Sequence, residues 1–368
     1  MTSSKHTAVR VGVEASKLLR ERRGMGRYVR NVLLQMPRLR PEIRFTLFVR
    51  RDRDIVPLGR QLALLSGELA ERTTIATVSA LPTADLDVVW YPWNWLTTRT
   101  ERAARVVTVL DLAPMLQLDH RWWKVFKRAI NRRRYLDTVR GADMMIAISE
   151  FTKRELQRLL PVDASKVRVT LLAADDLTPV AGGASPALDR LGVTGPFFLT
   201  VGAQEARKNL PVLYRAMELL HARGERVPLV QCGPSSRAQP RPWLHAAGYV
   251  SDAELSVLYH RATALVFPSF YEGFGLPALE AMAAGGRVVC ANASSLPEVV
   301  GDAALLFDAS DADALAAQLT RVLHDASLRD RMTHDGAAQA ARFRWSTTAR
   351  QTLAVFDEAM GRRALRGG

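Results

Sequence analysis

The sequence predicts an α/β protein built from two doubly wound, Rossmann-like domains. A chain of 368 residues exceeds the roughly 250–300 residues at which a single hydrophobic core stops growing. Its hydrophobic content of 48% and charged content of 24% are typical of a globular protein. Short apolar runs alternate with helix-forming segments, as in parallel sheets covered on both faces. A stretch rich in glycine and proline, residues 178–196, divides this pattern into two series.

The first series begins with a strand predicted over residues 9–15, a basic loop and the sequence Gly24-Met25-Gly26. A helix is expected from there to about Gln35, because proline at position 37 disfavours its continuation. Strand, glycine turn and helix are typical of a dinucleotide-binding unit, but the third glycine of that fingerprint is missing. We expect Gly24 and Gly26 to let the backbone approach a diphosphate without a Cβ clash. Further strands are predicted at Arg44–Val49, Asp87–Tyr91, Arg105–Leu110 and Met144–Ile148.

The second series continues the same alternation beyond the glycine- and proline-rich stretch. Strands are predicted at Phe197–Val201, Leu229–Cys232, Ala264–Phe267 and Arg287–Ala291, followed by a short apolar segment at Ala303–Phe307. Helices are predicted from about Asn209, at Asp252–Arg261, and near Asp311–His324 and Ser327–Arg342. No short repeat or low-complexity tract interrupts either series.

The segment 268–289, PSFYEGFGLPALEAMAAGGRVV, combines a glycine loop with two carboxylates. It follows an apolar strand and leads into a helix, because Pro277 suits a first helical turn. Such a loop offers backbone N–H groups and a helix N-terminus to an anion such as phosphate. A carboxylate there needs a ligand that also has hydroxyl groups, which a sugar and a ribose provide. We interpret Glu272 as a hexose ligand and Glu280 as a ribose ligand; the alternative is a structural turn with two solvated glutamates.

A cationic pair, Arg207-Lys208, follows the first strand of the second series, in the loop that begins at Gly202. It is expected at the same strand-end edge as the glycine loop. Two cations there would neutralise the charge that builds up on a leaving diphosphate. The chain has 44 Arg and 7 Lys, and Lys208 is the last lysine after Lys166, which suggests that a compact ammonium is required. The alternative is a cation at a helix N-terminus without a ligand.

The net charge of +14 is concentrated in the first half of the chain, where residues 1–175 hold 32 Lys and Arg against 18 Asp and Glu. Within it, residues 120–140 contain eight basic residues and one acid. Aromatic and basic residues alternate there with helical spacing, as in a helix lying on an anionic membrane. The proposed contact residues are Trp122, Trp123, Lys124, Phe126, Lys127 and Arg128. The alternative is a helix whose aromatic residues fill the core while its arginines are solvated.

Other features argue against several classes of function. The pair Asp85 and Asp87 could hold a metal ion, but it precedes a strand, so we interpret it as a polar strand entry. The histidines and the two cysteines, Cys232 and Cys290, show no metal-ligand spacing, and we expect no metal. The basic charge matches no known nucleic-acid-binding module. The N-terminus lacks the apolar core of a signal peptide, so a cytoplasmic protein is expected, peripheral on the inner membrane face if the basic helix binds lipid.

Several motifs together resemble the retaining glycosyltransferases of family 4. They are GMGRY (24–28), AISEFTKREL (147–156), RKN (207–209), GYVSDAEL (248–255), EGFGLPALEA (272–281) and SLPEVVGDAALLF (295–307). The resemblance covers nearly the whole chain and implies a GT-B fold, in which two Rossmann-like domains face each other across a cleft and no metal is required. It implies a first domain of residues 1–176, completed by a C-terminal helix over 345–368, and a second domain of residues 177–344.

The resemblance also implies roles for individual residues. Arg207 and Lys208 would stabilise the diphosphate, Glu272 would contact the donor hexose and Glu280 the ribose. The remaining residues implied to line the nucleotide-sugar site are Gly24, Gly26, Gly202, Tyr249, Val250, Gly273, Phe274, Gly275 and Leu276.

One position departs from the family pattern. Many members have His-Asp after the strand that corresponds to Arg105–Leu110, whereas this chain has Leu110-Asp111. Leucine can neither donate a hydrogen bond nor take a proton, while Asp111 is retained and is expected to orient a substrate.

The leading hypothesis is retaining transfer of a mannose- or rhamnose-like hexose from a GDP-, UDP- or dTDP-sugar to a lipid-linked glycan, in the synthesis of a cell-surface polysaccharide. The alternative is a nucleotide-sugar-binding scaffold with little activity, which Leu110 would explain. A sugar-nucleotide epimerase of the same architecture does not fit the two spaced glutamates.

Overall fold

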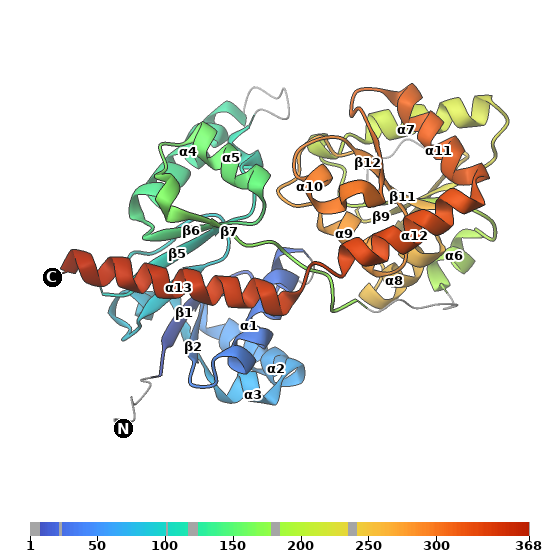
Figure 1. Cartoon of the computed structure of the whole chain (residues 1–368). Coiled ribbons are helices and arrows are strands. Elements are labelled where there is room, and N and C mark those ends of the chain that lie inside the picture. Colours follow the sequence, from blue (N-terminus) through green and yellow to red (C-terminus); the bar gives the residue numbers. More distant parts are fainter. Residues whose placement is uncertain are drawn as a thin grey trace. The chain divides into compact units, whose positions relative to one another are not determined.

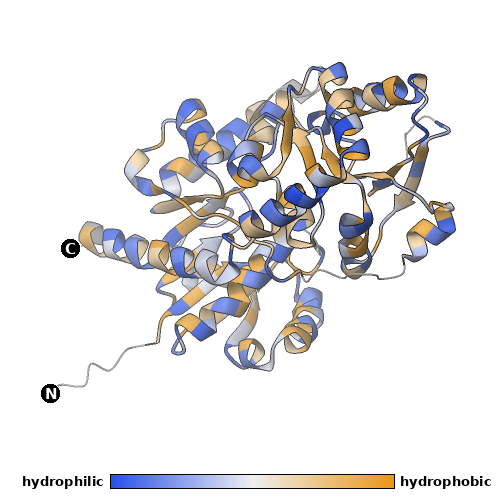
Figure 2. Cartoon of the chain, turned by 45° about the vertical axis from the view of Figure 1, so that its right-hand side comes forward, coloured by the Kyte–Doolittle hydropathy of each residue, from blue (hydrophilic) through white to orange (hydrophobic). Residues whose placement is uncertain are grey.

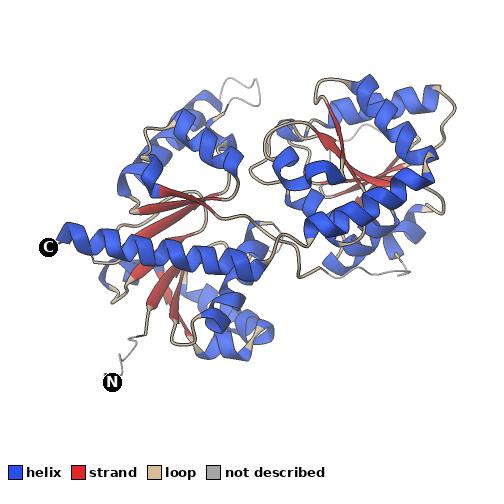
Figure 3. Cartoon of the chain, viewed as in Figure 1, coloured by secondary structure: helices blue, strands red, loops and turns tan. Residues whose placement is uncertain are grey.

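The computed structural model describes residues 8–21, 24–100, 102–116, 124–177, 185–234 and 241–367. Packing divides the chain into two units (Figure 1), one that runs to Leu172 and resumes at Trp345, and one that spans Ala173–Arg344. The predicted border between residues 176 and 177 lies close to this division. Each unit contains a parallel sheet with helices on both faces (Figure 3), so the predicted pair of Rossmann-like domains is confirmed.

The sheet of the first unit has the strand order β3-β2-β1-β4-β5-β6-β7. Its strands are β1 (Arg10–Glu14), β2 (Arg44–Val49), β3 (Thr73–Thr77), β4 (Val88–Tyr91), β5 (Ala104–Val109), β6 (Met144–Ala147) and β7 (Val167–Val169). Its helices are α1 (Met25–Leu39), α2 (Ile55–Leu65), α3 (Gly67–Glu71), α4 (Lys124–Gly141), α5 (Glu150–Leu159) and α13 (Trp345–Gly367). Short 3-10 turns lie at Asp52–Asp54, Val78–Thr83, Ala113–Met115 and Ala164–Lys166.

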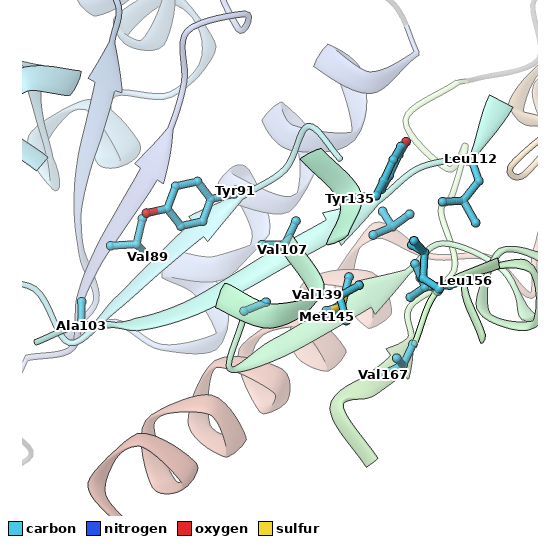
Figure 4. Close-up of a cluster of buried hydrophobic side chains, with 14 of the residues drawn as sticks. Val89, Tyr91, Ala103, Val107, Leu112, Tyr135, Val139, Met145, Leu156 and Val167 are labelled. Atoms are coloured by element: carbon cyan, nitrogen blue, oxygen red, sulfur yellow. The ribbon is translucent and has the colours of Figure 1, made fainter. Parts of the chain in front are cut away.

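The central strands of this sheet are buried on both faces. In β4, successive side chains pack into the core on alternate faces of the sheet. Val89 and Tyr91 belong to a core cluster with residues of α4 and α5 (Figure 4). Trp90 lies on the opposite face, 5.6 Å from Tyr28 of α1 and 6.0 Å from Phe356 of α13 between ring centroids. Because successive side chains of a strand point to opposite faces, a continuous apolar run is what a doubly covered sheet requires.

Helix α13 returns from the end of the chain to the first unit, as the resemblance implied. It packs on α1 and on β4, β5 and β6, and in Figure 1 it runs alongside this sheet. Its first turn is held by a hydrogen bond from Thr348 Oγ1 to the Leu171 carbonyl oxygen of 2.7 Å. Further along, Arg40 donates two hydrogen bonds to the carboxylate of Asp357, at 2.8 and 2.7 Å. Figure 2 shows hydrophobic and hydrophilic residues alternating along this helix, as expected for one buried face.

The second unit has the strand order β10-β9-β8-β11-β12-β13. Its strands are β8 (Phe198–Val201), β9 (Leu229–Cys232), β10 (Leu244–Gly248), β11 (Ala264–Phe267), β12 (Val288–Ala291) and β13 (Leu305–Phe307). Its helices are α6 (Pro186–Leu191), α7 (Leu210–Ala222), α8 (Asp252–Arg261), α9 (Leu276–Ala283), α10 (Leu296–Val300), α11 (Ala312–His324) and α12 (Ala326–Ala340), with 3-10 turns at Ala206–Lys208 and Gly301–Ala303. The chain reverses its direction across the sheet between β8 and β11, which is where ligands of such sheets gather.

The structure corrects one predicted boundary. Helix α1 does not end before Pro37 but continues to Leu39. Pro37 is buried in the last turns of α1, and beyond it the helical pattern continues, because the Arg40 N–H donates to the Met36 carbonyl at 2.9 Å.

The aspartate pair is structural, as expected. Asp85 and Asp87 both pair with Arg10 at the start of β1, the second of them at 2.9 Å.

Candidate active site

Two loops leave the switch point of the second sheet at the same edge. One follows β8 and the other follows β11, and these strands are parallel neighbours. Each loop ends in a residue with left-handed backbone that precedes a helix: Asn209 (φ 52°) before α7 and Gly275 (φ 98°) before α9. The N-termini of both helices therefore lie at one strand edge, where their free N–H groups favour an anion.

Glu272 bridges the two cations that the sequence placed at this edge. Its Oε2 accepts a hydrogen bond of 2.8 Å from Arg207 Nη1, and its Oε1 accepts one of 2.8 Å from Lys208 Nζ. The residue is only 7% exposed. The structure therefore brings together the three residues predicted to bind the diphosphate and the hexose.

The ionisation of Glu272 is controlled by these neighbours. Burial by itself would raise the pKa of this carboxyl group, but the charges of Lys208 and Arg207 outweigh it, so that the pKa lies below its ordinary value. Glu272 is therefore a carboxylate at neutral pH. Its oxygens can accept hydrogen bonds from a ligand, but the group has no proton to donate.

The lowered pKa predicts a pH-dependent contribution of Glu272 to stability. Because the pKa is lower in the folded than in the unfolded chain, the contribution is fully present above the ordinary value of 4.5 and is lost as the pH falls through the folded value. We expect the Tm advantage of the wild type over Glu272→Gln to be constant near neutral pH and to shrink below about pH 4.5. Thermal unfolding of both proteins between pH 7 and pH 3 measures this. A Tm difference that is independent of pH would show that the ion pairs contribute nothing.

Hydrogen bonds to backbone carbonyl groups hold the two loops in place. Asn209 Nδ2 donates to the Pro268 carbonyl at 3.1 Å and to the Ala309 carbonyl at 2.7 Å. The Phe270 N–H donates to the Arg207 carbonyl at 3.1 Å. Charged groups held in this way need no rearrangement when charge develops on a ligand, which is the arrangement that favours catalysis.

The segment after β12 supports Glu272 from the other side. Ser294 Oγ accepts a hydrogen bond of 3.1 Å from the Glu272 N–H, and Ser295 Oγ donates one of 3.0 Å to the Glu272 carbonyl. Sequence reasoning assigned no role to Ser294. The one available signal was its position three residues after a predicted strand, at the same edge of the sheet as the other loops.

The glycines of both loops have steric reasons for their identity. A Cβ atom on Gly275 would lie 2.6 Å from Leu296 Cδ2, and one on Gly202 would lie 3.3 Å from Lys208 Cε. Gly202 also lines a small hollow beside Lys208 and the buried Ser269. The Lys208 ammonium lies 4.8 Å from the centroid of the Phe267 ring there. Because a Cβ atom at position 202 would crowd Lys208, glycine leaves room for the lysine side chain in this hollow.

Glu280 lies on α9, and its carboxylate accepts a hydrogen bond of 3.1 Å from the Tyr259 hydroxyl. Both glutamates of the motif are buried, Glu272 at 7% and Glu280 at 8% exposure. The alternative of a turn with two solvated glutamates is therefore wrong.

The other predicted residues of this unit have different environments. Tyr249 is 76% exposed and Val250 is buried, in the turn between β10 and α8. Phe274 is buried and packs edge-on against Phe343, with 6.0 Å between ring centroids. Gly273 is buried in the loop before α9, and Leu276 is buried as the first residue of this helix. Any contact of Phe274 with a ligand must therefore come from its backbone, as the loop geometry predicts.

The residues predicted in the first unit lie at its own strand ends. Gly24 (φ 52°) precedes α1, and a Cβ atom on Gly26 would lie 1.5 Å from the Glu21 carbonyl oxygen. Gly26 is thus required by the path of its own loop, and its approach to a diphosphate stays a prediction. Asp111 accepts a hydrogen bond of 3.2 Å from the Ala113 N–H through Oδ1, and its carbonyl accepts one of 2.7 Å from the Tyr135 hydroxyl.

Helix α4 contains the basic segment. Trp122 and Trp123 lie outside the described residues, as does the side chain of Lys124. Phe126 is 75% exposed and Ile130 is 55% exposed, so the alternative, in which the aromatic residues of this helix fill the core, is wrong for Phe126. Lys127, Arg128, Arg132 and Arg133 are exposed on the same helix, whose other face buries residues such as Tyr135. None of the helices in the described ranges combines the length and the apolar character needed to cross a bilayer.

Comparison with known proteins finds a family model that is similar to part of this chain. Residues 190–339 match the family model of the glycosyl transferases group 1. The matched residues lie within the second unit, which holds the switch-point site.

The curated relatives include several mannosyltransferases. O-antigen chain mannosyltransferase B of Escherichia coli is 36% identical over 246 residues, which cover 61% of this chain and 65% of that protein. The serotype-specific mannosyltransferase WbdA of Escherichia coli is 28% identical over 236 residues, covering 58% of this chain and 29% of WbdA. MMP alpha-(1->4)-mannosyltransferase of Mycolicibacterium hassiacum is 41% identical over 123 residues, covering 32% of this chain and 30% of that enzyme. The matches thus span less than two thirds of each of these relatives.

Solved structures share the fold over nearly the whole chain. Sucrose-phosphate synthase from Thermosynechococcus elongatus superposes with a TM-score of 0.70 at 17% identity, covering 95% of this chain and 98% of that one. HepE from Anabaena, in complex with UDP and glucose, gives a TM-score of 0.68 at 15% identity, covering 94% and 98%. The GT-B fold implied by the sequence motifs is confirmed.

Proposed function

We propose that the protein is a family 4 glycosyltransferase that moves a hexose from a nucleotide sugar to a glycan acceptor with retention of configuration. The observation that carries this proposal is the bridging of Arg207 and Lys208 by Glu272, between two helix N-termini at the switch point of the second sheet. Cations and free N–H groups suit a diphosphate, while a carboxylate suits sugar hydroxyls. Few ligands other than a nucleotide sugar present both chemistries within one molecule.

The proposed reaction breaks the bond between the sugar C1 and the diphosphate oxygen. The acceptor oxygen forms the new bond to C1 on the same face, and its proton passes to the departing phosphate oxygen. Arg207 and Lys208 stabilise the charge that grows on the diphosphate, which is the role a metal ion has in other transferases. We therefore propose that no metal is required. Glu272 accepts hydrogen bonds from the hexose, and Glu280 binds the ribose.

The likeness to mannosyltransferases supports a mannose-like donor. The enzyme named O-antigen chain mannosyltransferase B supports a place in cell-surface polysaccharide synthesis, with a lipid-linked glycan as the acceptor.

A donor panel tests the proposal. Purified protein is incubated with GDP-mannose, dTDP-rhamnose and UDP-glucose, with and without a mannoside acceptor and with EDTA present. We expect release of one nucleoside diphosphate that is increased by the acceptor and unaffected by EDTA, and a product in which NMR detects the same anomeric configuration as in the donor. A β-linked product from an α-linked donor would contradict retention.

The alternative is a nucleotide-sugar-binding scaffold, and Leu110 is the observation that favours it. Leu110 is 5% exposed, and its N–H donates a hydrogen bond of 2.6 Å to Asn94 Oδ1, so this position is occupied by a fixed, apolar residue. Tight binding of a nucleotide sugar without turnover of any donor would support the scaffold. Restoration of turnover by Leu110→His would show that this position limits the chemistry.

We also propose that α4 contacts an anionic membrane surface from the cytoplasmic side, so that the protein is peripheral. The helix carries seven basic residues and one acid, and it exposes Phe126 and Ile130. Each basic residue near such a surface contributes about 1 kcal/mol. We expect Phe126→Ser/Ile130→Ser to lower binding to vesicles with 30% phosphatidylglycerol by roughly tenfold, because two apolar side chains no longer enter the interface.

Vesicle flotation measures this effect. Leu64→Ser on α2 is the matched control, since Leu64 is 89% exposed and lies on another helix. Equal binding of the double variant and the wild type would rule out α4 as the contact surface. Equally strong binding to neutral phosphatidylcholine vesicles would show that attraction between the basic residues and anionic lipid does not contribute.

A further inference from the structure

Three consecutive residues after β12 contact the loop that contains Glu272. The Glu272 N–H donates to Ser294 Oγ at 3.1 Å, and Ser295 Oγ donates to the Glu272 carbonyl at 3.0 Å. The next residue, Leu296, lies so close to Gly275 that a Cβ atom on the glycine would be 2.6 Å from Leu296 Cδ2. We call residues 294–296 the brace, because they contact both ends of the loop 272–275.

The backbone of Ser294 is strained. Its φ of 57° lies in the left-handed region, which disfavours residues with a Cβ atom. Among the described residues, the other non-glycine positions with positive φ are Asn94 and Asn209, and asparagine tolerates this conformation better than most residues. Left-handed backbone at a serine persists only where its surroundings impose it, and such strain is often found at functional sites.

Ser295 uses its hydroxyl group for the loop and not for its own helix. It stands at the N-cap of α10, where a serine oxygen ordinarily accepts an N–H of the first helical turn. In the described ranges that capping bond is not formed, and the hydroxyl donates to the Glu272 carbonyl. Ser295 is fully buried, so this bond is shielded from water. The two serines therefore suit the loop 272–275 better than they suit the segment to which they belong.

The brace determines where the Glu272 side chain begins. The peptide group between Tyr271 and Glu272 is held at its N–H by Ser294 and at its carbonyl by Arg207 Nη1, at 3.4 Å. The Glu272 carboxylate in turn reaches Arg207 and Lys208 at 2.8 Å each. A rotation of this peptide would move the Glu272 Cα atom and lengthen both bonds. Because a displacement of about 1 Å can cost about 10²-fold in rate, the brace bears directly on the site.

We propose that Ser294 and Ser295 are positioning residues that hold Glu272 in place for the donor hexose. They act through the backbone of Glu272, and their hydroxyl groups carry the role, because each forms one hydrogen bond with that backbone. The identity of the hexose as the ligand of Glu272 rests on the proposed function. The hold of the two serines on Glu272 does not.

Two variants of Ser294 separate its hydroxyl group from its strained backbone. Ser294→Ala and Ser294→Gly both remove the hydroxyl, but only Ser294→Gly also removes the strain, so it should have the higher Tm. The affinity for a nucleotide sugar relative to that for the free nucleoside diphosphate measures the hexose contact. We expect this affinity ratio to fall about tenfold in both variants, because a misplaced carboxylate no longer meets the sugar hydroxyls. Binding of the free nucleoside diphosphate should not weaken.

Calorimetric titrations with GDP and GDP-mannose, UDP and UDP-glucose, and dTDP and dTDP-rhamnose measure the affinity ratio. Ser295→Ala should lower it in the same direction. Ser66→Ala is the matched control, because Ser66 Oγ also accepts a backbone N–H, from Leu69 at 3.2 Å, and it should lower the Tm without changing the ratio. An unchanged ratio in Ser294→Ala, or a wild-type ratio in Ser294→Gly, would overturn the proposal, since the hydroxyl would then have no role.

A double-mutant cycle separates this inference from the proposed function, because it needs no ligand. If Ser294 positions the Glu272 carboxylate, the Tm loss of Ser294→Ala/Glu272→Gln is smaller than the sum of the two single losses. The losses of Ser66→Ala and Glu272→Gln should add. Should none of the nucleotide sugars bind to the wild type, a non-additive cycle would still support the positioning role, and the proposed function alone would fail. Additive losses of Ser294→Ala and Glu272→Gln would overturn the inference.

Discussion

Lys208→Ala is expected to lower kcat for glycosyl transfer about 10²- to 10³-fold, the usual effect of removing one preorganised donor at a developing negative charge. The ammonium lies 2.8 Å from Glu272 and beside Gly202, so that no neighbouring side chain can take its place. Arg207 stays, but its guanidinium also pairs with Glu205 at 2.7 Å, which limits how far it can move toward the diphosphate. We expect KM for the nucleotide sugar to change much less than kcat, because the leaving-group charge is larger in the transition state.

Steady-state kinetics with the donor identified from the panel measure this loss. Lys153→Ala is the control, because Lys153 is a partly exposed lysine of the first unit whose nearest acid, Glu150, is 3.9 Å away. Lys208→Arg should recover only a small part of the activity, since a planar guanidinium does not fit where a compact ammonium lies against the Phe267 ring. If Lys208→Ala retained more than a tenth of the wild-type kcat, Lys208 would not stabilise the leaving diphosphate as proposed.

Glu272→Gln is expected to have opposite effects on transfer and on nucleotide binding. Transfer should fall about 10²-fold, because the carboxylate that accepts from the hexose is lost. Binding of the free nucleoside diphosphate should become several times tighter, because a negative charge 2.8 Å from both cations no longer competes with it. Stability should fall by about 3 kcal/mol, as for a buried ion pair that loses one partner.

Calorimetric titration with the nucleoside diphosphate, together with donor kinetics, separates these effects. Glu155→Gln serves as the control, since this residue forms a surface pair with Arg158 on α5 at 2.7 Å. Weaker nucleotide binding in Glu272→Gln would mean that Glu272 positions the cations and does not compete for them. The combined variant Lys208→Ala/Glu272→Gln should lose less than the sum of both single losses, because the two side chains act as one unit.

The sequence was sufficient for the fold and for the outline of the site, because both depend on local patterns. Strands such as Leu229–Cys232 and Ala264–Phe267 are short apolar runs bounded by breakers, and they occur as predicted. The positions of Arg207, Lys208 and Glu272 after neighbouring strands were enough to predict that they meet.

What could not be predicted depends on contacts distant in sequence. Strand β3 (Thr73–Thr77) is polar and lies at the edge of its sheet, so no apolar run marks it. The pairing of both Glu272 oxygens with the cations is a property of the folded loops, and so is the support from Ser294. The exposure of Phe126 depends on which face of α4 packs on the sheet, and periodicity alone cannot show this.

The return of α13 to the first unit has a consequence for the order in which the protein can fold during synthesis. Trp345 and Phe356, at 2% and 0% exposure, fill the face of the first sheet that also receives Trp90. The ribosome makes these residues after all residues of the second unit. The second unit is contiguous and can fold as soon as Arg344 is free, whereas the first unit keeps an open apolar face until α13 has been made. The part of the chain that is made first is therefore the part that is completed last, and it is the part that a cell must protect from aggregation.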